Sequence, residues 1–290
     1  MAHQDPSSHY FTSQGLRLHY ADWGNDDAPL LLLIHGSRDH CRSWDWTARL
    51  LRKDWHVITP DLRGHGNSAW SPDGDYDRPT LVDDLEQLIF HFGNKPVTII
   101  AHSLGGNVSL RYAGLLPHMV NKLVAIEGLG HAPKMLADRM AIPLAEHWRR
   151  WLTARRAAAE RHPKHYATVD EAVKRMRAAN TSLSEERAQH LTHHGIQRNE
   201  DGSWSWKFDS KIYVFPFLDI PLEVLHGLWG AITCPTLLLC GDHSSASNPL
   251  TDGRIRHFGQ NANVVEIENA GHWVHHDQFD RFMKEILSFI

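Results

Sequence analysis

The chain has 290 residues, 42% of them hydrophobic, which is enough to fill one α/β domain with an insertion or two small domains. Its formal net charge of −4 gives no strong field for nucleic acid or anionic lipid, so we expect no nucleic acid and no membrane as a partner. The N-terminal residues lack an apolar core, and no run of about 18 apolar residues occurs, which favours a cytoplasmic protein without a secretory signal. The sequence does not set the oligomeric state, and a homodimer stays open.

Short apolar runs alternate with helical patterns over the first half of the chain. The expected strands are residues 9–11, 16–20, 30–34, 57–59, 97–101 and 123–126. The expected helices between them are residues 44–51, 81–92 and 106–115. Continuous apolar strands that alternate with helices predict an α/β fold, in which a mostly parallel sheet carries helices on both faces.

This alternation stops after Glu127. Residues 131–226 carry helical segments and no convincing core strand, and S-L-S-E-E at 182–186 is typical of a helix start. The expected strands resume at 236–240 and 264–268, and a final amphipathic helix covers 279–289. We therefore predict a split core domain, residues 1–130 and 227–290, with a helical domain at 131–226 inserted between two of its strands.

Three cysteines occur in the chain, Cys41, Cys234 and Cys240, without a C-x-x-C spacing. An odd number without such spacing is most simply explained by free thiols in a reducing compartment. None of the three lies in a turn suited to a nucleophile, so we do not expect cysteine catalysis.

A serine stands at a sharp strand-to-helix turn in V-T-I-I-A-H-S-L-G-G, residues 97–106. Such a turn exposes the Oγ of Ser103 at the carboxyl edge of the sheet, and small residues on both sides let strand and helix cross closely. Gly105 is one of them, whereas Ala101 stands where the G-x-S-x-G pattern has its first glycine. A helix-capping serine is the alternative. The context favours a nucleophile, which needs a neutral imidazole and an acceptor that orients it.

The chain has 23 histidines, so a single histidine is weak evidence for a function. The informative ones lie in N-A-G-H-W-V-H-H-D at 269–277, which follows the last expected strand. This position places His272 at the same edge of the sheet as Ser103. We expect His275 and His276 to cap the next helix or to face solvent. A metal bound by H-x-x-H-H would need further ligands and would leave the serine turn unexplained, so we predict no metal and no cofactor.

Five motifs together resemble the α/β-hydrolase fold superfamily over essentially the whole chain. They are L-L-L-L-I-H-G (30–36), D-L-R-G-H-G-N-S (61–68), A-H-S-L-G-G (101–106), C-P-T-L-L-L-C-G-D (234–242) and N-A-G-H-W (269–273). The resemblance implies a mostly parallel sheet of the eight-stranded α/β-hydrolase type, with residues 131–226 as a helical cap domain. In this family, Arg63 and His65 would anchor loops.

The resemblance leaves two candidates for the acid that orients His272. The family usually keeps this acid in G-x-x-D after the penultimate strand, but here G-D-H-S at 241–244 puts Ser244 in its place. Asp242 stands two residues early, so we expect its side chain to point elsewhere. Some members take the acid from the end of the strand after the nucleophile helix, where Glu127 stands. Glu127 is therefore preferred and Asp242 is the alternative.

The resemblance also implies an oxyanion hole formed by the backbone N–H groups of Ser37 and Leu104. We expect Arg38, beside this loop, to be a surface arginine rather than a contact for an acidic substrate. Four tryptophans are candidates for the substrate pocket, with packing inside the protein as the alternative for each: Trp44, Trp204, Trp206 and Trp273.

The predicted function is that of a serine hydrolase that cleaves a small or medium carboxylic ester through an acyl-enzyme intermediate. Lactonase, thioesterase or carbon–carbon bond hydrolase chemistry would use the same triad and stays open. A non-catalytic binding protein on a hydrolase scaffold is the second class of function.

Overall fold

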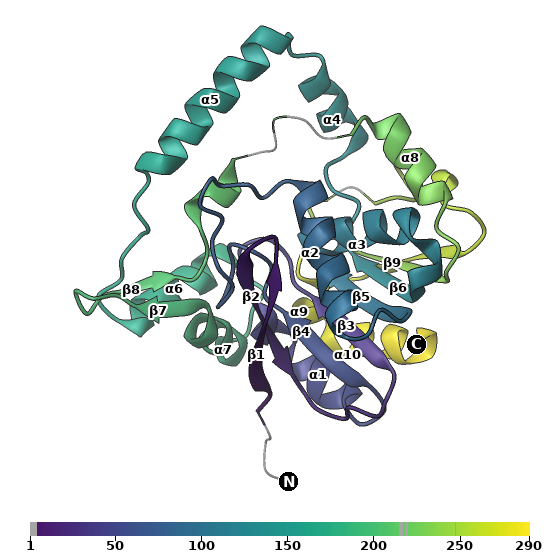
Figure 1. Cartoon of the computed structure of the whole chain (residues 1–290), viewed down its shortest axis with the longest axis horizontal. Helices are drawn as coiled ribbons and strands as arrows, with labels where there is room; N and C mark the ends of the chain where they lie inside the picture. The colour runs from purple at the N-terminus through teal and green to yellow at the C-terminus, as the bar shows by residue number, and fades with distance from the viewer. Residues whose placement is uncertain (1–4, 215–216, 218–219, 247) are drawn as a thin grey trace.

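An eight-stranded sheet forms the centre of the computed structural model (Figure 1), in the order β1-β2-β4-β3-β5-β6-β9-β10. The described residues are 5–214, 217, 220–246 and 248–290. β1 and β4 pair antiparallel with β2, and the other neighbours are parallel. The strands are Ser7–Ser13 (β1), Leu16–Asp22 (β2), Leu30–Ile34 (β3), His56–Pro60 (β4), Val97–His102 (β5), Val120–Ile126 (β6), Thr236–Gly241 (β9) and Ala262–Ile267 (β10). The predicted fold class is confirmed.

Helices cover both faces of this sheet, because successive side chains of its apolar strands point to opposite sides. In β3, Leu32 and Ile34 pack into one buried cluster, whereas Leu31 and Leu33 pack into the other. The first cluster includes residues of α2 (Arg78–His91), α3 (Leu104–Leu115) and α8 (Leu222–Gly230). The second includes residues of α1 (Asp45–Leu51), α9 (Val274–Asp277) and α10 (Phe279–Phe289).

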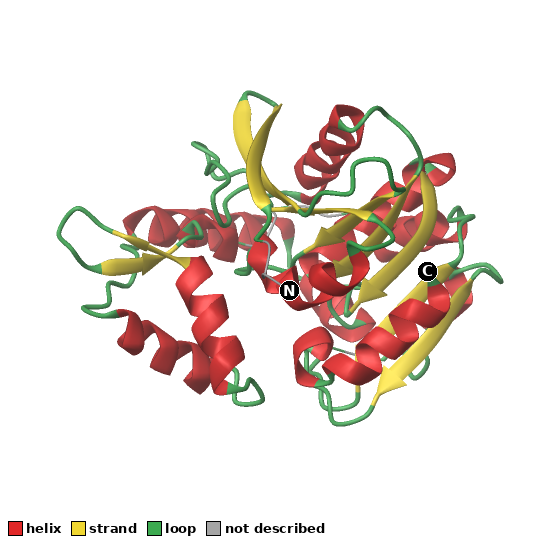
Figure 2. Cartoon of the chain, turned by 90° about the horizontal axis from the view of Figure 1, so that it is seen from below, coloured by secondary structure: helices red, strands yellow, loops and turns green. Residues whose placement is uncertain are grey.

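The elements from α4 to β8 lie outside the sheet: in Figure 1, α4 and α5 lie above it and α6, α7, β7 and β8 lie to its left, and Figure 2 shows the β7–β8 hairpin apart from it. They are α4 (Pro133–Met140), α5 (Leu144–Glu160), α6 (Val169–Ala179), α7 (Glu185–Gly195), β7 (Ile196–Arg198) and β8 (Trp204–Trp206). The Ser184 side chain caps α7 by accepting a hydrogen bond from the Arg187 amide, at the helix start expected there. α8 extends beyond residue 226 and packs Leu225 and Trp229 against the core. Within the described residues, no helix is long and apolar enough to cross a bilayer.

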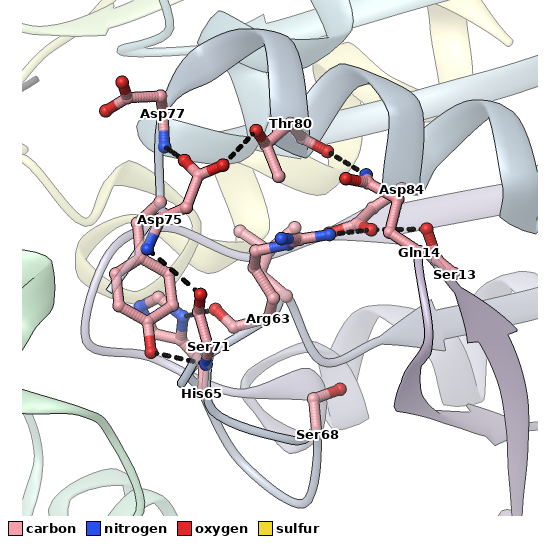
Figure 3. A network of polar contacts seen from close by, with 12 residues as sticks. Ser13, Gln14, Arg63, His65, Ser68, Ser71, Asp75, Asp77, Thr80 and Asp84 are labelled. Atoms are coloured by element: carbon pink, nitrogen blue, oxygen red, sulfur yellow. Dashed lines mark hydrogen bonds and ion pairs between the residues drawn. The ribbon is translucent and has the colours of Figure 1, made fainter. Parts of the chain in front are cut away.

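A buried ion pair holds the D-L-R-G-H turn in place (Figure 3). Arg63 donates through Nε to Asp84 Oδ2 at 2.5 Å and through Nη2 to Asp84 Oδ1 at 2.6 Å. Ser13 Oγ donates to the same carboxylate at 2.6 Å, and His65 Nδ1 donates to the Arg63 carbonyl at 2.9 Å. Arg63 and His65 therefore anchor this loop, as expected from the sequence.

We expect Asp84→Asn to destabilise the fold by about 3–5 kcal/mol, because it leaves the Arg63 guanidinium buried without its counter-charge. The side chains of Arg63 and Asp84 are only 4% and 6% exposed. Urea unfolding followed by circular dichroism measures the change. Asp138→Asn, which removes the exposed pair with Lys134, is the matched control and is expected to change stability little. Equal losses in the two variants would contradict a structural role for the buried pair.

Candidate active site

Ser103 lies between β5 and α3 in a backbone conformation that non-glycine residues rarely adopt, with φ 49° and ψ −110°. Close backbone packing supports this turn. A Cβ added at Gly105 would lie 2.6 Å from the His35 carbonyl oxygen, and one added at Gly106 would lie 2.8 Å from Gly128 Cα. Only glycine fits at these two positions, and the crossing of β5 and α3 fixes the Ser103 side chain at the carboxyl edge of the sheet.

The imidazole of His272 lies beside the Ser103 hydroxyl, with Nε2 2.9 Å from Oγ. His102 helps to hold it there, because Nε2 of His102 donates to the His272 carbonyl oxygen at 2.9 Å. Burial, with His275 and His272 nearby, holds the pKa of His102 well below its usual range, so that its ring is neutral. No role for His102 is predicted from the sequence, although this residue directly precedes the serine.

Glu127 reaches the other nitrogen of this imidazole, with Oε2 3.3 Å from His272 Nδ1. Its side chain is 0% exposed, and a buried carboxylate is costly unless it is hydrogen-bonded. Two further donors satisfy it: the Gly241 amide at 2.8 Å from Oε1 and Ser244 Oγ at 2.8 Å from Oε2. A carboxylate at Nδ1 favours the tautomer with the proton on that nitrogen, which leaves Nε2 free to accept the proton of Ser103.

The carboxylate of Asp242, the alternative acid, contacts groups other than the His272 imidazole. Its Oδ1 accepts the Ala270 amide at 3.2 Å, and its Oδ2 lies 3.9 Å from His243 Nε2. Among the described residues, no hydrogen bond joins Asp242 to His272. The structure thus brings Glu127 to the imidazole and leaves Asp242 apart. Ser244, which stands where the family usually has its acid, donates a hydrogen bond to the Glu127 carboxylate.

We expect Ser244→Ala to lower kcat about tenfold with little change in KM, because the buried Glu127 carboxylate loses a hydrogen bond that helps to hold it against His272. Steady-state ester hydrolysis measures both constants. Ser244→Thr keeps a hydroxyl and is expected to recover part of the loss. Ser288→Ala, at an exposed serine of α10, is the control. If alanine and threonine at position 244 behaved alike, Ser244 would have no positioning role.

The loop after β3 packs directly on the serine turn. A Cβ added at Gly36 would lie 2.6 Å from His102 Nδ1 and 3.1 Å from Ser103 Cβ. Burial lowers the pKa of His35 to about 3, so its neutral ring donates from Nδ1 to the Gly36 carbonyl and accepts the Leu62 amide at Nε2. These contacts fix the backbone of the loop that presents Ser37.

The two amides expected in the oxyanion hole both belong to segments next to Ser103. Ser37 lines the same cavity as the serine. Leu104 is the first residue of α3, and the first N–H groups of a helix have no partner within it. The partial positive charge of that helix end also favours a negatively charged oxygen.

A cavity of about 720 Å³ lies over Ser103 and His272 and is lined by both the core and the segment between β6 and β9. Trp206 and Trp273 line it, as expected. The prediction for Trp44 is wrong: this ring is 0% exposed and stacks on His275 in the core, with ring centroids 4.6 Å apart.

The prediction for Trp204 is also wrong, because this residue does not line the cavity. It packs instead against a small buried cluster of Tyr166, Ala172 and Ile196. Its backbone pairs with that of Tyr166, so the ring belongs to the interior of the segment and not to the cavity.

His275 and His276 are buried, at 2% and 6% exposure, so the expectation that they cap a helix or face solvent is wrong. His276 Nε2 lies 2.8 Å from Ser43 Oγ, and burial holds the pKa of both rings well below the usual range. With Asp39 they bring three ligand-type atoms within 4.8 Å of one another, and this buried group is among those in the described part of the chain that could hold a metal ion.

The three cysteines are free, as expected, and their side chains are buried. Burial, with the charges of Glu127 and Glu266 nearby, raises the pKa of the Cys240 thiol to about 12. Burial also raises the pKa of Cys41 and of Cys234. Since the thiolate is the nucleophilic form, none of these thiols competes with Ser103.

Comparison with known proteins shows the family of the chain. Residues 31–285 match the sequence profile of the alpha/beta hydrolase family. The chain belongs to the alpha/beta hydrolase family.

Named relatives of this alpha/beta hydrolase include enzymes. The chain is 29% identical over 275 residues to the "Serine hydrolase-like protein" of Danio rerio, covering 92% of this chain and 83% of that protein. It is 26% identical over 284 residues to the "sn-1-specific diacylglycerol lipase ABHD11" of Mus musculus, covering 92% and 82%. The solved structure of the "Thioesterase Domain From Curacin Biosynthetic Pathway" shares the fold, with a TM-score of 0.82 at 24% identity over 98% of this chain and 100% of that one.

Proposed function

We propose that this alpha/beta hydrolase is a serine esterase that cleaves small or medium carboxylic esters through an acyl-enzyme intermediate. The observation that carries the proposal is the 2.9 Å contact between Ser103 Oγ and His272 Nε2, with the buried carboxylate of Glu127 at the opposite ring nitrogen. This is the hydrogen-bonded series that activates a serine hydroxyl in unrelated hydrolases.

In the acylation step, Ser103 Oγ attacks the ester carbonyl while His272 Nε2 takes the hydroxyl proton. The Glu127 carboxylate orients the ring and stabilises the imidazolium that forms. The amides of Ser37 and Leu104 donate to the oxyanion of the tetrahedral intermediate. When that intermediate collapses, the bond to the alcohol breaks, and His272 returns the proton to the leaving oxygen.

The second half of the reaction uses the same groups with water as the nucleophile. His272 Nε2 takes a proton from the water as its oxygen attacks the acyl carbonyl of the Ser103 ester. Collapse of the second intermediate breaks the bond to Oγ, returns the proton to the serine and releases the carboxylic acid. No redox step occurs, and the residues described supply every proton transfer.

The segment 131–226 acts in this proposal as a cap domain over a core formed by residues 1–130 and 227–290. Its aromatic side chains Tyr166, Trp206 and Phe208 line the cavity together with Trp273 of the core. A partly apolar wall of this kind and a volume of about 720 Å³ suit a small or medium acyl compound. Lactones and thioesters present the same carbonyl and are alternatives at this site.

A fluorophosphonate probe followed by a panel of p-nitrophenyl esters, lactones and thioesters tests the proposal. We expect the probe to label Ser103, as identified by peptide mass spectrometry, and the folded protein to turn over short p-nitrophenyl esters. Heat-denatured protein is the control and should remain unlabelled. A folded protein that is not labelled and turns over no acyl compound in the panel would favour a binding protein on this scaffold.

A further inference from the structure

The cavity over Ser103 is positively charged, although the chain carries a net charge of −4. Four cationic side chains line it: Arg38, Arg161, Lys164 and Arg175. The carboxylate that also lines it, Asp277, accepts the Gly271 amide at 2.8 Å, and burial raises its pKa. The local excess of positive charge therefore lies in the space that a substrate would occupy.

Two of these cations meet at one aromatic ring. Arg38, in the loop that presents Ser37, lies with its guanidinium carbon 5.3 Å from the centroid of Tyr213. Arg161, which follows α5, lies 5.1 Å from the same centroid. Like charges placed together repel, and an anion bound near both relieves that repulsion. Tyr213 thus brings together a guanidinium from the loop after β3 and one from the end of α5, and both border the same cavity.

The lining cations lack the carboxylate partners that several other arginines of the chain have. Arg42, Arg63 and Arg150 each contact a carboxylate at 3.0 Å or less. In the part of the chain that the structure describes, no carboxylate lies within ion-pair distance of the four lining cations. Three of them lie over aromatic rings: Arg38 and Arg161 over Tyr213, and Lys164 over Tyr166 at 5.4 Å. An open cation without a counter-charge is available to a ligand.

An aromatic row connects these charges across the cavity wall. The centroids of Tyr166 and Trp206 lie 6.1 Å apart, those of Trp206 and Phe208 6.4 Å apart, and those of Phe208 and Tyr213 6.2 Å apart. Lys164 lies at the Tyr166 end of this row and the two arginines lie at its Tyr213 end. The apolar part of a substrate would rest on the rings, and an anionic end would reach the cations.

We propose that the substrate is an acyl compound with an anionic oxygen group, a carboxylate or a phosphate, and that Arg38 and Arg161 bind this group beside Tyr213. The proposal rests on the esterase function proposed above and names its substrate class. It also revises the expectation that Arg38 is only a surface arginine, because its side chain borders the same cavity as the serine.

Substrate pairs that differ in charge test the proposal. Mono-p-nitrophenyl glutarate and p-nitrophenyl valerate have the same acyl length, and only the first carries a terminal carboxylate. We expect kcat/KM to favour the glutarate about tenfold, mainly through KM, and the preference to shrink as salt is raised. Butyryl-coenzyme A against butyryl-N-acetylcysteamine is the second pair, in which the anion is a phosphate on the leaving group. The pair that shows the larger preference identifies the anion.

The variant Arg161→Gln should reduce the preferred pair's ratio about tenfold. Arg177→Gln is the matched control: it removes the same charge from exposed α6, where Arg177 pairs with Glu185 at 3.5 Å outside the cavity lining, and should leave the ratio unchanged. If the wild-type protein turned over both members of each pair equally, or if the two variants changed the ratio equally, the anion site would be wrong and the esterase proposal would stand.

A binding measurement separates the two proposals when no substrate is turned over. Glutarate and inorganic phosphate are titrated into the full chain, and tryptophan fluorescence is recorded because Trp206 and Trp273 line the cavity. Saturable binding that weakens about tenfold in Arg161→Gln, but not in Arg177→Gln, would support the anion site even without catalysis. Absence of binding together with absence of turnover would overturn both proposals.

Discussion

Replacing Ser103 by alanine is expected to lower kcat for p-nitrophenyl butyrate by about 10⁴–10⁶-fold, with little change in KM. The substitution removes the Oγ that His272 Nε2 contacts at 2.9 Å, so no acyl-enzyme can form. Alanine keeps the Cβ and lacks only the hydroxyl, and the φ of 49° at this position is strained for both residues. The loss should therefore appear in the chemical step and not in folding.

As a control, the kcat of Ser103→Ala is compared with that of His272→Ala and that of the double variant. The rate losses of residues that act as one catalytic unit are not additive. The kcat of the double variant should therefore equal that of the less active single variant. Circular dichroism and urea unfolding should be similar for all four proteins. If Ser103→Ala kept more than about a tenth of the wild-type rate, far above the residual expected without the nucleophile, the nucleophile would lie elsewhere.

The second large effect is expected at Glu127. Glu127→Gln should lower kcat by about 10²–10⁴-fold, because the neutral amide cannot stabilise the imidazolium of His272. The amide would also place an NH₂ group among donors, since the Gly241 N–H and the Ser244 hydroxyl both point at this carboxylate. Steady-state kinetics at several pH values, compared with the wild type, measures the loss.

Asp242→Asn serves as the matched control for this substitution. The carboxylate of Asp242 accepts the Ala270 amide and makes no described contact with His272. An asparagine oxygen can accept the same hydrogen bond, so we expect kcat to fall less than about threefold. Equal losses at positions 127 and 242, or the opposite order, would contradict the assignment of the acid to Glu127.

The core of the fold could be predicted from the sequence, because its strands are buried on both faces and appear as continuous apolar runs. Residues 97–101 were expected as a strand, and β5 covers Val97–His102. The orientation of individual side chains could be predicted less well from the sequence. Trp44 is aromatic and lies near a loop of the site, but the sequence does not say which face of its short helix meets the core, and the ring is fully buried there.

Ser103 and His272 could be located from the sequence because each lies in a local motif next to a strand end. The contacts that support them join residues far apart in the chain. Ser244 and Glu127 are separated by 117 positions, and His102 and the His272 carbonyl by 170. No local pattern encodes such contacts, and the supporting roles of Ser244 and His102 emerge only when β5, β6 and β9 lie side by side.

The neighbouring positions of β6 and β9 have an evolutionary consequence. The two strands run parallel, with Ile126 opposite Leu239, so their ends deliver side chains to one point in space. A carboxylate can move from one strand to the other over generations while the imidazole stays where it is. A search that demands an aspartate at the fourth position of G-x-x-D after β9 would discard this chain, although a carboxylate reaches the same imidazole from Glu127 at the end of β6.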